Sequence, residues 1–193
     1  MFDKDISILE KKLGFKFKNP KLIYIALTHK SHPSSGENNQ RLEFLGDSIL
    51  GSIIAHQLYI QFPKAKEGQL SRLKSTLVKG QSLEDLAESL DMGQHLVLGA
   101  SERKSGGFNR ASILEDTVEA IIGAVFIDGG FAAAQKLVLH LFSPRLDMIS
   151  LDDAKSDANV MVKVMVKVME NSWQSDGKSD GKTMVKVMAN RKK

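Results

Sequence analysis

The chain has 193 residues, of which 42% are hydrophobic, and this length and composition suit one folded domain with an appendage. It contains no cysteine, which excludes a disulfide framework and thiolate zinc sites and agrees with a reducing cytosol. The net charge of +4 is unevenly distributed, because residues 151–193 hold nine of the 27 basic and six of the 23 acidic residues. Residues 1–150 are therefore nearly neutral, and a polyanion bound to them would need local cationic groups.

The first residues show no targeting signal. The segment Met1-Phe-Asp-Lys-Asp5 carries acidic groups and no long apolar run follows it, so we expect no secretory signal. We also find no run of about 20 apolar residues of the kind that spans a membrane. The sequence therefore predicts a cytoplasmic protein without a membrane partner.

Apolar residues recur at helical spacing through most of residues 1–150, and strand-like alternation is scarce there. We therefore predict an all-α body. Ser112, three residues before Glu115, forms a plausible capping box that would start a helix. Glycine, proline, serine and asparagine residues mark the expected breaks. The candidate helices cover about residues 6–13, 22–27, 42–58, 68–78, 82–90, 111–127 and 131–142.

Two acidic pairs interrupt apolar segments that lie far apart in the chain. Glu43 and Asp47 are four residues apart, and Asp116 and Glu119 are three apart, so each pair would share one helix face. An unpaired buried carboxylate is costly, and a shared divalent cation would compensate the charge. Carboxylate oxygens favour Mg²⁺ or Mn²⁺ over zinc, and such ions can activate water against a phosphodiester.

The alternative is that these four carboxylates are ordinary solvated surface charges. The residues around them argue against it, because they are apolar and indicate that both helices are central. They are Leu42, Phe44, Leu45, Ile49, Val118, Ile121 and Ile122.

The segment Asn39-Gln-Arg-Leu-Glu-Phe-Leu-Gly-Asp-Ser-Ile-Leu50 closely resembles the signature of the ribonuclease III nuclease domain. Supporting matches follow in the family's order and extend the resemblance over about residues 5–150, in the bacterial single-domain arrangement. They are Leu27-Thr-His-Lys-Ser31, residues 67–75, Leu98-Gly99, Lys104-Ser-Gly-Gly107 and residues 113–124.

The resemblance implies the all-α fold of that nuclease domain over residues 1–150. It also implies a Mg²⁺-dependent endoribonuclease, with Mn²⁺ able to substitute. Such an enzyme cuts double-stranded RNA to 5′-phosphate and 3′-hydroxyl ends, in processing of ribosomal RNA precursors and some mRNA and tRNA. Glu43, Asp47, Asp116 and Glu119 fall on the family's metal positions, with Asp47 and Glu119 the principal catalytic residues.

Four further residues take expected roles from the resemblance. The family domain is a homodimer, and Phe44 falls where an aromatic side chain packs into the partner subunit, although a plain core position is an equal alternative. Glu67 falls on an acidic position of the catalytic valley. Gln40 stands where many members have glutamate and would alter substrate handling. Lys74 would contact a phosphate, against the alternative of an ordinary solvated lysine.

One histidine pair has a local zinc spacing. His29 and His32 lie three residues apart, but the sequence offers them no further ligands. Structural or exposed histidines are therefore the favoured interpretation.

Residues 151–193 differ from the rest of the chain. They contain short repeats, such as Met161-Val-Lys-Val-Met-Val-Lys-Val-Met169, which predict either disorder or a weak β-hairpin. The family usually carries a double-stranded RNA-binding domain here, and this segment is too short and wrongly patterned for one. We therefore expect weaker and more salt-sensitive RNA binding.

Two other functions stay open. The chain could be a non-catalytic RNA-binding or dimerisation module that keeps the nuclease fold, although four uncompensated carboxylates do not help a protein bind a polyanion. It could also be a helical metal-dependent hydrolase of small phosphorylated substrates. Cleavage of a long duplex, compared with turnover of a nucleotide, separates the latter from the nuclease.

Overall fold

The computed structural model describes residues 6–33, 37–78 and 80–152, and it confirms the all-α fold for this part of the chain. Most of the predicted repetitive tail, residues 153–193, lies outside the described residues. The described helices are α1 (Ser7–Leu13), α2 (Pro20–Leu27), α3 (Gln40–Gln61), α4 (Glu67–Val78), α5 (Gln81–Ser89), α6 (Ala100–Lys104) and α7 (Ala111–Leu146), with 3₁₀ turns η1 (Met92–His95) and η2 (Gly107–Asn109).

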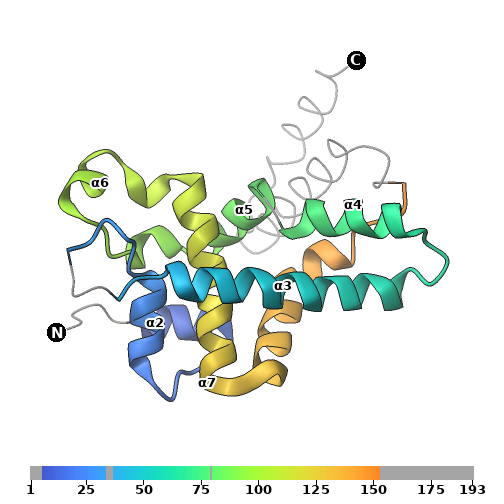
Figure 1. Ribbon diagram of the computed structural model, residues 1–193, viewed down its shortest axis with the longest axis horizontal. Coiled ribbons are helices and arrows are strands. Elements are labelled where there is room, and N and C mark those ends of the chain that lie inside the picture. The colour runs from blue at the N-terminus through green and yellow to red at the C-terminus, as the bar shows by residue number, and fades with distance from the viewer. Residues whose placement is uncertain (1–5, 34–36, 79, 153–193) are drawn as a thin grey trace, which may run out of the picture.

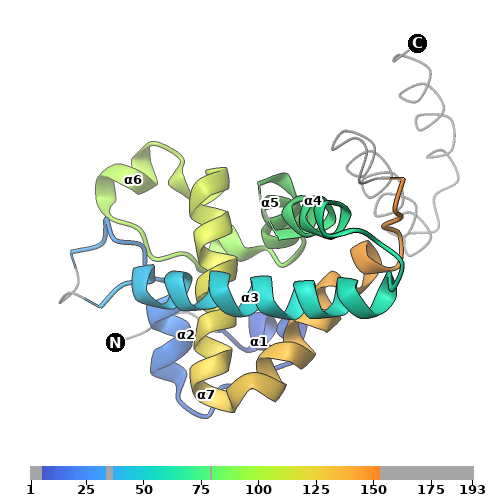
Figure 2. The same ribbon diagram turned by 45° about the vertical axis from the view of Figure 1, so that its right-hand side comes forward.

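Two long helices organise the fold. Helix α3 crosses the first half of α7 (Figure 1), and no other pair of elements is in such extensive contact. Helices α2 and α5 also pack on α7, and α4 packs on α3 (Figure 2). The crossing is therefore the centre of the molecule, and any side chain beside it is held by the most extensively packed helices.

Helix α7 changes direction at Gly130, where the sequence predicts a break between two helices. Gly130 has φ 78°, which is left-handed backbone that glycine adopts without steric cost. The carboxylate of Asp128 accepts hydrogen bonds from the backbone N–H groups of Lys18 (2.7 Å) and Asn19 (3.0 Å). The bend is thereby joined to the segment that leads into α2.

The predicted capping box at Ser112 is wrong. Arg110 is the N-cap residue of α7, with extended backbone, and no side chain caps this end. Helix α7 starts directly after η2, so Ser112 already lies in its first turn, where its hydroxyl is not at the capping position.

Helix α7 is long and apolar enough to cross a membrane, although its sequence holds no unbroken run of about 20 apolar residues. Half of its most apolar window is buried inside the protein, because α2, α3 and α5 pack against it. It also carries Asp116 and Glu119 in its first half. The helix therefore forms the core of the domain.

Candidate functional site

Helices α3 and α7 approach so closely that two positions of the crossing have room only for glycine. A methyl group added to Gly46 would overlap the backbone carbonyl oxygen of Glu119, and one added to Gly123 would overlap that of Leu42. Both glycines are buried. Close backbone contact is the reason for glycine here, since both positions are helical and any residue could adopt that conformation.

This contact brings the two acidic pairs together. Glu43 and Asp47 flank Gly46 on α3, and Glu119, whose carbonyl meets Gly46, lies one turn after Asp116 on α7. The two acidic faces, which the sequence predicts to share one metal site, therefore meet at one crossing.

Burial raises the pKa values of three of these carboxylates, and repulsion between the carboxylates adds to the rise at Glu43 and Glu119. Partial burial, followed by the charges of Asp47, Glu43 and Asp116, raises the pKa of Glu119 to about 8. The pKa of Glu43 is raised by burial and then by Asp116, and that of Asp116 is raised by burial. We call Glu43, Asp47, Asp116 and Glu119 the acidic quartet.

Glu115 lies beside the quartet but faces another neighbour. Its pKa is raised by burial and then by the charges of Asp116 and Glu84, and it accepts a hydrogen bond from the backbone of Gly80. Glu84 belongs to α5, and Gly80 precedes that helix. Glu115 thus faces α5, and its charge has the smallest effect of those that raise the pKa of Glu119, so it offers a matched control for the quartet.

The quartet suits a divalent cation in its donor chemistry. Its donors are carboxylate oxygens, which hard cations such as Mg²⁺ prefer. The charges that shift the pKa of Glu119 are all negative, those of the other three quartet members and of Glu115. In the described residues, no three histidine, aspartate or glutamate side chains are already placed to ligate one ion together. The four side chains therefore have the donor atoms that Mg²⁺ prefers, and they come from two helices that meet at one point. Their rotamers would have to change for three of them to ligate one ion.

Two lysines lie beside the quartet. The Cβ position of Gly51 is 3.3 Å from both Cε and Nζ of Lys74, so this ammonium group lies over α3 one turn beyond Asp47. The other is Lys30, whose positive charge acts on Glu43 and Asp116 and opposes the rise in their pKa values. Lys74 was expected near the site, whereas sequence reasoning gave Lys30 no role.

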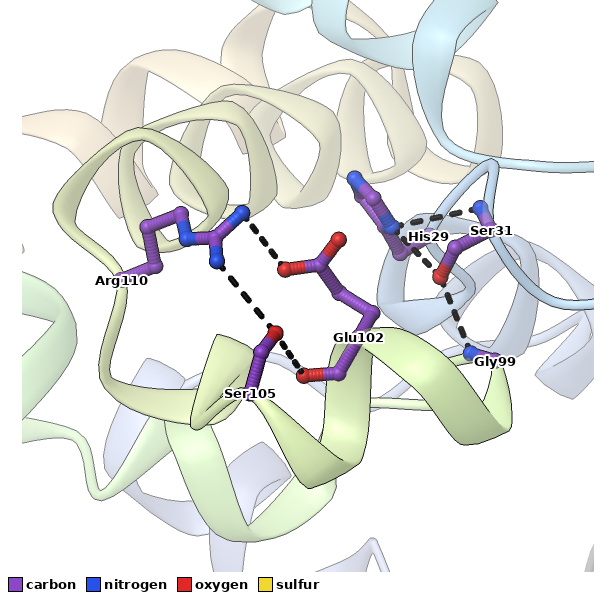
Figure 3. Close-up of polar contacts among 6 residues, drawn as sticks. All are labelled: His29, Ser31, Gly99, Glu102, Ser105 and Arg110. Carbon is purple, nitrogen blue, oxygen red and sulfur yellow. Dashed lines mark hydrogen bonds and ion pairs between the residues drawn. The ribbon is translucent and has the colours of Figure 1, made fainter.

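His29 has a structural setting rather than the arrangement of a zinc ligand. It is buried, and its Nδ1 accepts a hydrogen bond from the backbone N–H of Ser31 (3.2 Å) and lies 2.9 Å from the Ser31 hydroxyl. That hydroxyl also accepts from the backbone N–H of Gly99 (2.9 Å; Figure 3). Burial lowers the pKa of His29, partly offset by the negative charge of Glu102.

A second set of contacts, separate from those of His29, holds the start of α7. Arg110 forms an ion pair with Glu102 (2.7 Å), and its guanidinium group also donates to the hydroxyl of Ser105 (3.4 Å; Figure 3). The ion pair joins α6 to the residue that precedes α7. The contacts of Arg110 thereby hold the start of the helix that carries Asp116 and Glu119.

The remaining predicted site residues have different settings. Phe44 is 79% exposed, so the alternative of a plain core residue is wrong. Gln40 is exposed at the start of α3, one turn before Glu43. Glu67 is exposed at the start of α4, where it accepts a hydrogen bond from Ser71 (2.7 Å). Its charge is not among those that shift the pKa values of Glu43, Asp116 and Glu119.

A cavity of about 540 Å³ lies on another side of the fold, between the end of α5, η1, η2 and α7. Its lining is mainly apolar and includes Met92, Leu96 and Phe108. None of its lining residues belongs to the acidic quartet. The chemistry of the site therefore belongs to the acidic quartet beside the helix crossing and not to this cavity.

Comparison with known proteins gives consistent matches. A family model described as Ribonuclease-III-like matches residues 19–146. A curated relative named Ribonuclease 3, from Nitrosococcus oceani, is 54% identical over 140 residues, which are 72% of this chain and 59% of the relative. The chain spans 59–66% of the length of the curated relatives it matches.

Solved structures show the same similarity. A crystal structure of the nuclease domain of ribonuclease III from Campylobacter jejuni matches with a TM-score of 0.72 and 39% identity, over 76% of this chain and 99% of that one. A second structure of the Campylobacter jejuni domain, described as showing structural flexibility in a region involved in dimer formation, matches with a TM-score of 0.70 and 40% identity, over 72% and 96%.

Proposed function

The chain belongs to the ribonuclease III family, and we propose that it is a Mg²⁺-dependent endoribonuclease that cuts double-stranded RNA to 5′-phosphate and 3′-hydroxyl ends. The observation that carries the proposal is the convergence of four carboxylates from α3 and α7 at the glycine crossing. Family membership supports a nuclease, and the acidic quartet supplies the groups that metal-assisted phosphodiester hydrolysis requires.

Each residue has a defined task in this proposal. Glu43, Asp47, Asp116 and Glu119 hold the metal, with Asp47 and Glu119 as the principal catalytic residues. Bound Mg²⁺, for which Mn²⁺ can substitute, would polarise the phosphate and lower the pKa of an attacking water.

Three other residues shape the site around the RNA. Lys74, with its ammonium group over α3, contacts a backbone phosphate. The resemblance assigns Gln40, one turn before Glu43, and Glu67, at the start of α4, to the surface that receives the RNA. These are polar groups that hold and orient the RNA next to the scissile bond.

We propose a homodimer with Phe44 at its interface. An aromatic side chain that is 79% exposed on a helix of the core is expected to gain apolar burial from a second copy. The Campylobacter jejuni relative has a region involved in dimer formation, which supports the same assembly here. Dimerisation would give two acidic quartets, one for each strand of a duplex.

The biological setting is also part of the proposal. We place the protein in the cytoplasm, acting on ribosomal RNA precursors and some mRNA and tRNA. RNA binding by this domain would rest on phosphate contacts and should depend strongly on salt.

The rival functions predict different reactions. A non-catalytic module would bind duplex RNA without cutting it, and a small-molecule hydrolase would turn over a nucleotide faster than it cuts RNA. We would incubate the full chain with a labelled RNA duplex, its single strand and a nucleotide, each with Mg²⁺ or EDTA. Cutting of the duplex alone, and with Mg²⁺ alone, is the expected result. Turnover of the nucleotide, or duplex binding without cutting, would overturn the nuclease proposal.

A further inference from the structure

A site with four carboxylates repels the phosphates of an RNA, so cationic groups must border the acidic quartet if RNA is to bind there. Glu43 and Asp47 form an acidic stripe along α3. Lys74 lies over Gly51, at one end of this stripe. Glu43 lies eight residues before Gly51, or about 12 Å along the helix axis. A cation near Glu43 would therefore border the opposite end of the stripe.

Three hydrogen bonds hold the backbone segment that carries Lys30. The backbone N–H of its neighbour His29 donates to the carbonyl oxygen of Val97 (3.0 Å), and Ser31 is joined to Gly99 through its hydroxyl. The start of α3 is attached to the same segment, because the backbone N–H of Asn39 donates to the carbonyl oxygen of Thr28 (2.8 Å). These bonds hold the segment next to the first turn of α3, which carries Glu43.

The side chain of Lys30 is available for a ligand. His29 turns into the core, whereas Lys30 is exposed, and its charge acts on Glu43 and Asp116. Arg110 is the other cation near His29, but it is used by its ion pair with Glu102. In the described part of the chain, Lys30 forms no ion pair within 4.0 Å of a carboxylate.

We propose that Lys30 binds a backbone phosphate of the RNA on the Glu43–Asp116 side of the cut, while Lys74 serves the opposite side. This inference rests on the proposed function and deepens it by assigning a substrate-positioning residue. The two lysines border the acidic stripe, so the RNA backbone is held on both sides of the scissile phosphate. Lys30 fixes the position of the RNA and takes no part in bond cleavage.

The test compares Lys30→Ala and Lys30→Arg with the unsubstituted full chain, and Lys136→Ala serves as the control. Lys136 is an exposed lysine on α7 beyond the bend at Gly130. Binding of a labelled RNA duplex is measured by fluorescence anisotropy in EDTA over a series of KCl concentrations. Steady-state cleavage with Mg²⁺ gives kcat and KM separately, and thermal unfolding confirms that each variant folds.

We expect Lys30→Ala to reduce the slope of log binding constant against log salt by about one unit. We also expect about three- to tenfold weaker binding at low salt, from the loss of one such phosphate contact. The loss should appear in KM more than in kcat, and Lys30→Arg should restore most of it because it keeps the charge. Lys136→Ala should behave like the unsubstituted protein.

An unchanged salt slope in Lys30→Ala would overturn the inference, even if cleavage fell. Tighter Mg²⁺ binding by Lys30→Ala, with unaltered RNA binding, would also overturn it and make Lys30 an internal counter-charge. These results differ from failure of the proposed function, in which the unsubstituted chain itself neither binds nor cuts the duplex.

Discussion

Replacing Gly46 by alanine tests whether the close crossing of α3 and α7 builds the site. The new methyl carbon would lie 2.6 Å from the carbonyl carbon of Glu119 and 2.9 Å from the backbone nitrogen of Gly123. Non-bonded carbon atoms prefer about 3.5–4.0 Å, so the two helices must separate by roughly 1 Å or more. The neighbouring atoms are backbone and cannot rotate away.

The energetic cost follows from that separation. A gap of about 0.5–1 Å forfeits roughly a quarter to a half of each dispersion contact across it, and overpacked cores lose about 1–3 kcal/mol. Alanine returns up to about 1 kcal/mol through its better helix propensity. We therefore expect Gly46→Ala to lower the free energy of unfolding by about 2 kcal/mol, measured by urea denaturation.

Gly51→Ala is the matched control on the same helix. The added methyl would meet only the end of the Lys74 side chain, at 3.3 Å, and this flexible chain can move. We expect its stability to stay within about 0.5 kcal/mol of that of the unsubstituted protein. Gly68→Ala, which would contact nothing within 4 Å, should be neutral or slightly stabilising.

The separation should also remove the metal response. Mg²⁺ or Mn²⁺ should raise the melting temperature of the unsubstituted protein and of Gly68→Ala, since binding to the native state stabilises it. Gly46→Ala should lose this rise, because Asp47 and Glu119 no longer converge. A Gly46→Ala protein as stable and as metal-responsive as Gly68→Ala would refute the reasoning.

Two further predictions concern the charge and the surface of the domain. In EDTA, the pKa of Glu119 is about 8 in the folded protein and 4.5 in the unfolded chain. The stability that this group contributes is therefore fully present below pH 4.5 and is lost as the pH rises to 8. At pH 8.5, Glu119→Gln should therefore be more stable than the unsubstituted protein by about 1–2 kcal/mol, after allowance for solvent screening. Near pH 4 the two proteins should be equally stable. A stability difference in urea denaturation that does not grow with pH would contradict this. Phe44→Ala should weaken dimerisation about 30-fold or more, as for a buried aromatic at an interface, with little change in monomer stability. Sedimentation velocity measures this, and an undiminished dimer would place the interface elsewhere.

The sequence predicts the helices well because their apolar residues repeat at helical spacing. It also predicts the two acidic faces, since the spacings of Glu43 with Asp47 and of Asp116 with Glu119 are local properties of a helix. The break at Gly129-Gly130 is found for the same reason: a glycine pair is a local signal, and Gly130 does bend α7.

Other features that depend on tertiary contact do not follow from the sequence. The turn η2 and the helix α6 contain three and five residues, too few to show a period, and η2 displaces the start of α7 from the expected Ser112 cap. Lys30 could not be assigned to the site because it is 13 residues before Glu43 and 86 before Asp116. Only the attachment of residues 28–31 to Val97, Gly99 and Asn39 brings it there.

The most direct test of the central claim is Mg²⁺-dependent cleavage of a labelled RNA duplex by Asp47→Asn, Glu119→Gln and Glu115→Gln. Glu115 is the matched control, because it neighbours Asp116 yet faces Gly80 and Glu84, and glutamine keeps a hydrogen-bond acceptor there. We expect the first two variants to bind the duplex in EDTA but to cut it at least about 100-fold more slowly with Mg²⁺, while Glu115→Gln cuts normally. Normal cleavage by Asp47→Asn and Glu119→Gln would contradict the account of the acidic quartet as the catalytic metal site.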